Sequence, residues 1–124
     1  MYSTVGVHPT RCGEFVSHQE GDQEYFTSLL ELINNNKDIV AAVGECGLDY
    51  DRTKFCDIET QQKYFTKQLE LSEATGLPLF LHNRASAADL VKILSENRDK
   101  MPAGGVVHSF DGTEEVIVKS EVLK

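Results

Sequence analysis

The sequence predicts an α/β fold in which about four βα units with parallel strands form part of a (β/α)₈ barrel. Short apolar runs recur along the chain, and each is followed by a polar loop and then by apolar residues at helical spacing. Strands that are apolar throughout and joined by helices are typical of a parallel sheet buried on both faces. Four units in 124 residues average about 31 residues each, and eight would reach the roughly 250 residues of a complete barrel. A four-stranded open α/β sheet is the alternative.

The strands are expected at residues 3–7, 39–43, 79–81 and 104–107, and the helices at 24–33, 59–74, 87–97 and from Glu114 onward. Three asparagines at 34–36 are a plausible stop for the first helix, and Gly76 closes the second. The inward faces of the helices are predicted to carry Phe26, Leu29, Leu30 and Ile33, then Tyr64, Phe65, Leu69 and Ser72, and then Leu90, Val91 and Leu94.

Length and composition indicate one domain, residues 1–124, of an ordinary globular type with 40% hydrophobic residues. The net charge is −8, and the basic residues are scattered. This argues against a protein that coats DNA through a basic surface. It leaves room for an enzyme that meets phosphate through bound divalent cations, because the metal then supplies the positive charge.

A cytoplasmic or nuclear location is expected. No apolar run approaches the roughly 20 residues of a membrane span, and the first residues lack the pattern of a signal peptide. The three cysteines are odd in number and form no C-x-x-C pair, which argues against a disulfide framework and against a structural zinc site.

The candidate site consists of His8, Glu45, His82 and His108, each of which follows a predicted strand. The carboxyl ends of parallel strands are where ligands and catalytic groups gather. One histidine at such a place is more often a hydrogen-bonded residue without a ligand, but three histidines and a glutamate at equivalent places favour a metal site. Imidazole and carboxylate ligands suit zinc, manganese, iron or magnesium, and two histidines with one carboxylate leave room for water or substrate.

Glu45 lies between Gly44 and Cys46 in the phrase GECGLD, whose glycines permit a sharp turn and a close approach to a ligand. The alternative for Glu45 is a helix-capping or solvated carboxylate. Strand alternation places Cys46 on the opposite face, where it would pack rather than act as a nucleophile. Asp49 either supports a ligand or forms a turn.

Arg84 follows His82 by two residues and either binds a phosphate or carboxylate of the substrate or is a surface residue at a helix start. Ser109 follows His108, but the sequence shows no Ser-His-Asp arrangement and no G-x-S-x-G motif, which disfavours serine hydrolysis.

The motifs of the chain resemble those of TatD-related deoxyribonucleases. These motifs are GVHP at residues 6–9, GECGLDY at 44–50, LPLFLHNR at 77–84 and VHSFDGT at 107–113. They occur in the family's order and with similar spacing, and the TRCGEF run at 10–15 is most similar to the eukaryotic branch. The resemblance covers nearly the whole chain.

This resemblance implies a TIM-barrel metallohydrolase that cuts phosphodiester bonds in DNA with divalent metal, Mg, Mn or Zn, and with two ions in the intact enzyme. Glu45, His82 and His108 would be metal ligands, and Glu45 and His8 catalytic residues. His8 would also contact a substrate phosphate, as Arg84 could.

The chain departs from the family pattern at both ends. An early H-x-H or N-x-T strand and a late aspartate in a Glu-Thr-Asp phrase are missing, and Asn83 stands where cysteine is common. We therefore expect an incomplete form that is not a competent enzyme by itself, with open strand edges at residues 3–7 and 104–107 through which it could self-associate. The alternatives are an amidohydrolase-like enzyme acting on a small amide, ester or lactone, and a non-catalytic fragment.

Overall fold

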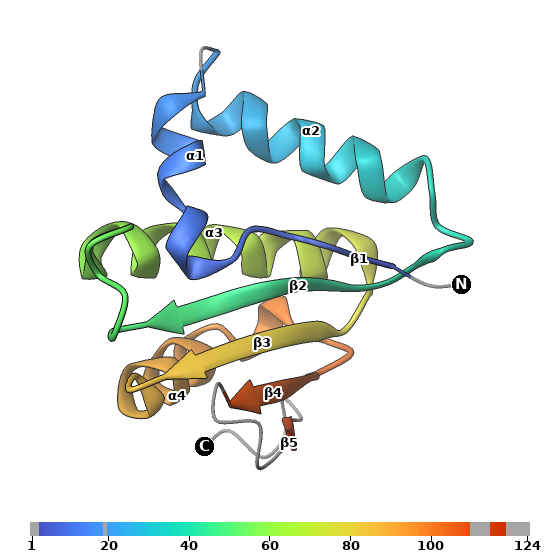
Figure 1. Ribbon diagram of the computed structural model, residues 1–124. Helices are drawn as coiled ribbons and strands as arrows, with labels where there is room; N and C mark the ends of the chain where they lie inside the picture. Colours follow the sequence, from blue (N-terminus) through green and yellow to red (C-terminus); the bar gives the residue numbers. More distant parts are fainter. Residues whose placement is uncertain (1–2, 19, 110–114, 119–124) are drawn as a thin grey trace.

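The computed structural model describes residues 3–18, 20–109 and 115–118 (Figure 1). Its strands form a single sheet in the order β1-β2-β3-β4-β5. The first four strands run parallel to one another, and β5 is antiparallel to β4. The strands are β1 (Ser3–Val5), β2 (Val40–Asp49), β3 (Leu79–Arg84), β4 (Gly105–Ser109) and β5 (Glu115–Val118). The predicted parallel sheet is confirmed.

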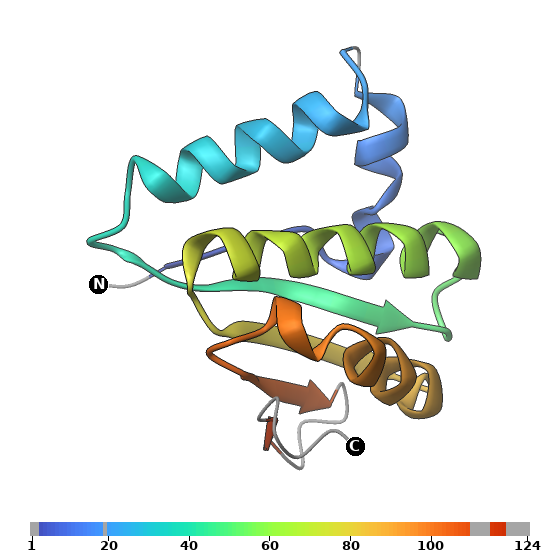
Figure 2. The same ribbon diagram turned by 180° about the vertical axis from the view of Figure 1, so that it is seen from behind.

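The three longer helices each connect two neighbouring parallel strands. They are α2 (Asp22–Asn34), α3 (Ile58–Thr75) and α4 (Ala87–Glu96). Helix α3 lies behind β2 in Figure 1 and in front of it in Figure 2, so it covers one face of the sheet. Asp57 begins α3 by accepting a hydrogen bond from the Thr60 amide at 2.8 Å, and Gly76 ends it in the left-handed conformation with φ of 73°. Both are ordinary helix signals.

The main core lies between the sheet and these helices. In register, Val43, Cys46 and Leu48 of β2 stand beside Leu79, Leu81 and Asn83 of β3. Apart from Asn83, these residues are buried in one hydrophobic cluster with helix residues. The predicted inward residues Ile33, Tyr64, Phe65, Leu69, Ser72, Leu90 and Leu94 are all buried.

Short helices that the sequence had not indicated follow β1 and precede β4. They are η1 (Pro9–Arg11), α1 (Gly13–Ser17) and η2 (Arg98–Lys100). Phe15 of α1 stacks on Tyr64 of α3 with ring centroids 4.5 Å apart. A second buried cluster forms there, so that α1 and η1 are attached to α3 beside the end of β1.

Three expectations were wrong. Residues 115–118 form a strand instead of a fourth helix, because Val116, Ile117 and Val118 are β-branched and the edge of β4 offers backbone partners. That pairing also removes the open edge expected at residues 104–107. Val91 is 52% exposed, because α4 covers the sheet with the narrower stripe that contains Leu90 and Leu94.

Among the described helices, none combines the length and the hydrophobicity that crossing a membrane requires.

Candidate metal centre

An irregularity in β2 positions Glu45. The register between β2 and β3 shifts between Gly44 and Cys46, so Glu45 is an extra residue without a partner on β3. Such bulges re-aim side chains and are common beside active sites. Because of this bulge, Cys46 returns to the buried, helix-covered face, and the Glu45 side chain lies next to two histidines.

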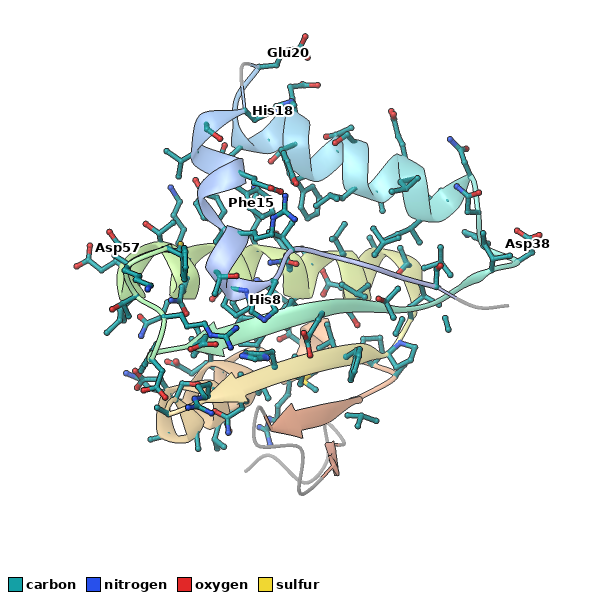
Figure 3. All side chains as sticks on the ribbon, in the orientation of Figure 1. His8, Phe15, His18, Glu20, Asp38 and Asp57 are labelled. Carbon is teal, nitrogen blue, oxygen red and sulfur yellow. The ribbon has the colours of Figure 1, made fainter. Side chains whose placement is uncertain are left out.

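His8, Glu45 and His82 converge from three adjacent segments of the chain. His8 follows β1, but Glu45 lies within β2, four residues before its end, and His82 lies within β3, two residues before its end. The expectation that Glu45 and His82 follow their strands was wrong, because the backbone beyond them stays paired between β2 and β3. The potential ligand atoms of His8, Glu45 and His82 all lie within 4.8 Å of one another. Glu45 Oε1 is 3.7 Å from His8 Nε2, and Glu45 Oε2 is 3.7 Å from His82 Nδ1. His8 lies in the turn after β1 (Figure 3), and its ring centroid is 4.4 Å from that of His82. Glu45 and His82 thus offer a carboxylate and an imidazole, which are ligand types that fit a divalent metal ion, with His8 beside them.

Asp49 supports His82 from the interior. Its Oδ2 lies 2.9 Å from His82 Nε2, while its Oδ1 accepts the Asp51 amide at 3.1 Å. Asp49 is fully buried and His82 is only 3% exposed. An ionised carboxylate can only accept, so His82 donates from Nε2, and the lone pair of Nδ1 faces Glu45. Asp49 thus does both things that the sequence left open: it supports a candidate ligand and closes a turn.

The His8 ring is oriented by Thr10. The Thr10 amide donates to His8 Nδ1 at 3.2 Å, and the Thr10 hydroxyl lies 2.8 Å from the same nitrogen. Because a backbone N–H can only donate, Nδ1 accepts and the neutral ring carries its proton on Nε2, facing Glu45. Burial lowers the pKa of His8 from its ordinary value, and the neighbouring His82 lowers it further. His8 is therefore arranged as a neutral hydrogen-bond donor.

Two buried glutamines of α3, two turns apart on the same face, hold the backbone beneath the site. Gln68 accepts from the Val7 amide at 2.7 Å and donates to the Val7 carbonyl at 3.1 Å. Gln61 accepts from the Asp49 amide at 2.8 Å and donates to the Asp49 carbonyl at 2.9 Å. Both side chains are fully buried. Sequence reasoning missed them; the signal was a polar residue at each of two positions within the apolar stripe of a helix.

A glycine permits close contact between β2 and β3. Gly47 pairs with His82 and has φ of 144°. A Cβ at this position would collide with the His82 carbonyl oxygen. Only glycine therefore allows the strands to approach so closely here.

The structure also locates the other residues that the sequence singled out. Arg84 pairs with Asp51 through an Nε–Oδ2 bond of 2.6 Å and is 36% exposed. Cys46 is fully buried, and burial raises the pKa of its thiol to about 12, which fits packing rather than nucleophilic attack. His108 is paired in register with His82, but its side chain lies outside the described part of the structure.

A concavity of about 310 Å³ adjoins the group and is lined by Gly6, Val7, His8, Arg11, Glu14 and Glu45. It provides space beside two of the converging side chains. Two carboxylates, an imidazole and a guanidinium border this space, from Glu14, Glu45, His8 and Arg11.

Known proteins are similar to this chain in sequence and in fold. A family model described as TatD related DNase matches residues 1–121. The chain is 43% identical to a Schizosaccharomyces pombe protein named "Deoxyribonuclease Tat-D", over 90% of this chain and 36% of that protein. It is 39% identical to a Cronobacter turicensis protein named "3'-5' ssDNA/RNA exonuclease TatD", over 92% of this chain and 40% of that protein.

Among solved structures, a TatD family hydrolase from Entamoeba histolytica superposes with a TM-score of 0.68 at 40% identity, covering 77% of this chain and 30% of that one. The chain thus spans less than half the length of the relatives it matches. The family model covers residues 1–121 and the superposed structure is 40% identical, and the chain therefore belongs to the TatD related DNase family.

Proposed function

We propose that this chain is part of a metal-dependent deoxyribonuclease that hydrolyses phosphodiester bonds in DNA. The observation that carries the proposal is the Asp49–His82–Glu45 arrangement. A buried carboxylate directs the lone pair of His82 Nδ1 toward Glu45, 3.7 Å away, next to a concavity that a substrate can enter. Carboxylate-supported histidines of this kind are typical of metal ligands.

Glu45 and His82 would hold the metal, and His108 would complete the ligand set because its backbone is in register with that of His82. Mg, Mn and Zn all fit such ligands, and two ions in the complete protein follow from the family resemblance. Bound metal would supply Lewis acidity and lower the pKa of water.

His8 and Glu45 would act directly on the substrate. His8 lines the concavity, and its Nε2–H would donate to a phosphate oxygen there. Glu45 turns Oε2 toward His82 and Oε1 toward His8, so one oxygen can serve the metal while the other accepts a proton from the attacking water. Arg84 would bind a more distant phosphate while Asp51 orients it.

The first test is metal binding, because it does not depend on turnover by this chain. Calorimetric titration with Mn²⁺ or Zn²⁺ should show binding that Glu45→Gln abolishes. His108→Asn should weaken metal binding by about 10-fold or more, since even the loss of a residue that only supports a ligand lowers metal affinity by that much. A chain that binds none of these ions would contradict the proposal.

The substrate class is tested in parallel. For the complete protein, nucleotide release from DNA, and from the RNA that the Cronobacter turicensis relative's name includes, is compared with hydrolysis of a small amide, ester and lactone. Nucleotide release alone supports the nuclease. Hydrolysis of the small substrates alone would support the amidohydrolase-like alternative instead.

Two further proposals concern the cellular compartment and the self-association of the chain. Three free cysteines support a reducing compartment, cytoplasmic or nuclear. Self-association through β1 is supported by its place at the end of the sheet order and by the exposure of Ser3 and Thr4. Sedimentation of the purified chain over a concentration range tests the second proposal, and a monomer throughout would refute it.

A further inference from the structure

Arg11 lies on the same side of the structure as His8. His8 caps the 3₁₀-helix η1, and the Arg11 amide donates to the His8 carbonyl at 2.8 Å. In a 3₁₀-helix, side chains three residues apart lie one above the other. Arg11 and His8 accordingly line the same concavity, together with Glu45.

A chain of hydrogen bonds holds the Arg11 guanidinium in place. Tyr25 donates from its hydroxyl to Glu14 Oε1 at 2.8 Å, and Glu14 Oε2 accepts from Arg11 Nε at 2.9 Å and from Nη2. Burial and the Glu14 contact raise the pKa of Tyr25 to about 12, so the hydroxyl keeps its proton at neutral pH. An exposed ion pair alone would hold an arginine only loosely, but here the acceptor is itself anchored.

The free side of this guanidinium is available to a ligand. Arginine has five N–H donors, and the bonds to Glu14 use one on Nε and one on Nη2. The side chain is 69% exposed. Among the residues that line the concavity, it carries the one permanent positive charge. Glu14 and Glu45 also line the concavity, so a phosphate would be favoured there only in direct contact with the N–H donors of Arg11 that Glu14 does not use.

We propose that Arg11 binds a phosphate group of the nucleic-acid substrate, the one next to the phosphate at Glu45 and His82, and that the Tyr25–Glu14 pair positions it. The inference rests on the proposed function and adds a second anion contact to the same site. The ligand class is a phosphodiester or free phosphate, for which the planar guanidinium fork is well suited.

The test measures binding to the Mn²⁺-loaded chain. Inorganic phosphate is titrated by calorimetry, and a short fluorescent single-stranded oligonucleotide by anisotropy at several salt concentrations. Arg11→Gln should weaken the binding of phosphate and of the oligonucleotide by about 5-fold or more. It should also reduce the salt dependence of oligonucleotide affinity by the equivalent of about one phosphate contact. Arg11→Lys should restore part of the affinity, and Tyr25→Phe should cause a smaller loss than Arg11→Gln.

Arg98→Gln is the matched control, because Arg98 lies in η2 before β4, at the opposite end of the strands. It should leave phosphate affinity unchanged. Manganese affinity should be the same in Arg11→Gln as in the wild-type chain, since Arg11 is not a ligand.

The outcomes separate this inference from the proposed function. Equal phosphate affinity in wild type and Arg11→Gln, no phosphate binding by the wild type, or a parallel loss of manganese binding would each overturn the role of Arg11. Phosphate binding that depends on Arg11, together with a complete protein that binds metal but releases no nucleotides from DNA, would leave that role intact and contradict the nuclease.

Discussion

Asp49 and His82 form a hydrogen-bonded pair in the interior, with Asp49 Oδ2 2.9 Å from His82 Nε2. The same carboxylate accepts the Asp51 amide through its other oxygen. Both oxygens of Asp49 therefore face donors, and the pair determines which nitrogen of His82 is available at the surface of the site.

Replacing Asp49 with asparagine should weaken metal binding by about 10- to 100-fold. An amide has one oxygen, so either His82 or the Asp51 amide would face an N–H group instead of an acceptor. If His82 reverses its tautomer in response, the proton moves to Nδ1, next to Glu45. Calorimetric titration with Mn²⁺ measures the change.

Asp57→Asn is the control for this substitution, because it removes the same charge from an exposed position and asparagine remains a good N-cap of α3. Its metal affinity should match the wild type. Equal losses in both variants would mean that net charge, and not the Asp49–His82 bond, sets the affinity.

Replacing Gln68 with methionine should lower the free energy of unfolding by about 2–4 kcal/mol, because it leaves the N–H and C=O of Val7 without partners in the interior. The substitution should also weaken metal-dependent phosphate binding, since Val7 precedes His8. Urea denaturation and calorimetry measure the two effects.

Gln62→Met is the control on the same helix, because Gln62 bonds Tyr50 and Asp89 side chains rather than the strand backbone. We expect less than half the loss of stability and no change in phosphate binding. A Gln68→Met variant as stable as Gln62→Met would show that water or a shifted backbone satisfies Val7.

Replacing Gly47 with alanine should destabilise the chain by about 2–4 kcal/mol, because it combines a strained positive φ with a collision against β3. Gly13→Ala should be neutral or slightly stabilising, because a Cβ at Gly13 meets nothing within 4 Å. Thermal and urea unfolding of the two variants compare them directly. Similar stabilities would contradict the close approach of β2 to β3.

The His8 ring should titrate below its ordinary pKa of about 6.5 in the metal-free chain, since burial and then His82 lower the pKa. Between the lowered pKa and 6.5, the unfolded chain binds more protons than the folded chain, so His8 reduces stability as the pH falls through that window. NMR of the ring protons gives the midpoint. A midpoint at or above 6.5 would refute this.

The His8→Asn variant serves as the control for the stability effect. It lacks the titrating ring, so its free energy of unfolding should fall less between pH 7 and pH 5 than that of the wild type.

In the complete protein, chelation should abolish most DNA binding as well as turnover. With a net charge of −8, affinity for phosphate depends on bound metal more than on a basic surface. Oligonucleotide anisotropy with and without a chelator measures this dependence. Undiminished binding in chelator with a steep salt slope would show that the surface itself binds DNA.

The sequence by itself determined the parallel strands, the longer helices and which of His8, Glu45 and His82 belongs to which βα unit, but it ended the second and third strands too early, before Glu45 and His82. Local periodicity and turn residues are readable without tertiary contacts, because they depend on residues close in the chain. For the same reason, the run that ends at Val118 could be mistaken for a helix, since its conformation is decided by pairing with β4, a nonlocal contact.

Only the tertiary structure decided how these residues act together. The bulge that turns Glu45 toward the histidines appears only when β2 pairs with β3. Gln61 and Gln68 become backbone supports only when α3 packs against the sheet, which brings Gln68 to a residue 61 positions earlier in the sequence. Arg11 joins the site through Glu14 and Tyr25 because α1 packs against α2, and no local pattern in the sequence encodes that contact.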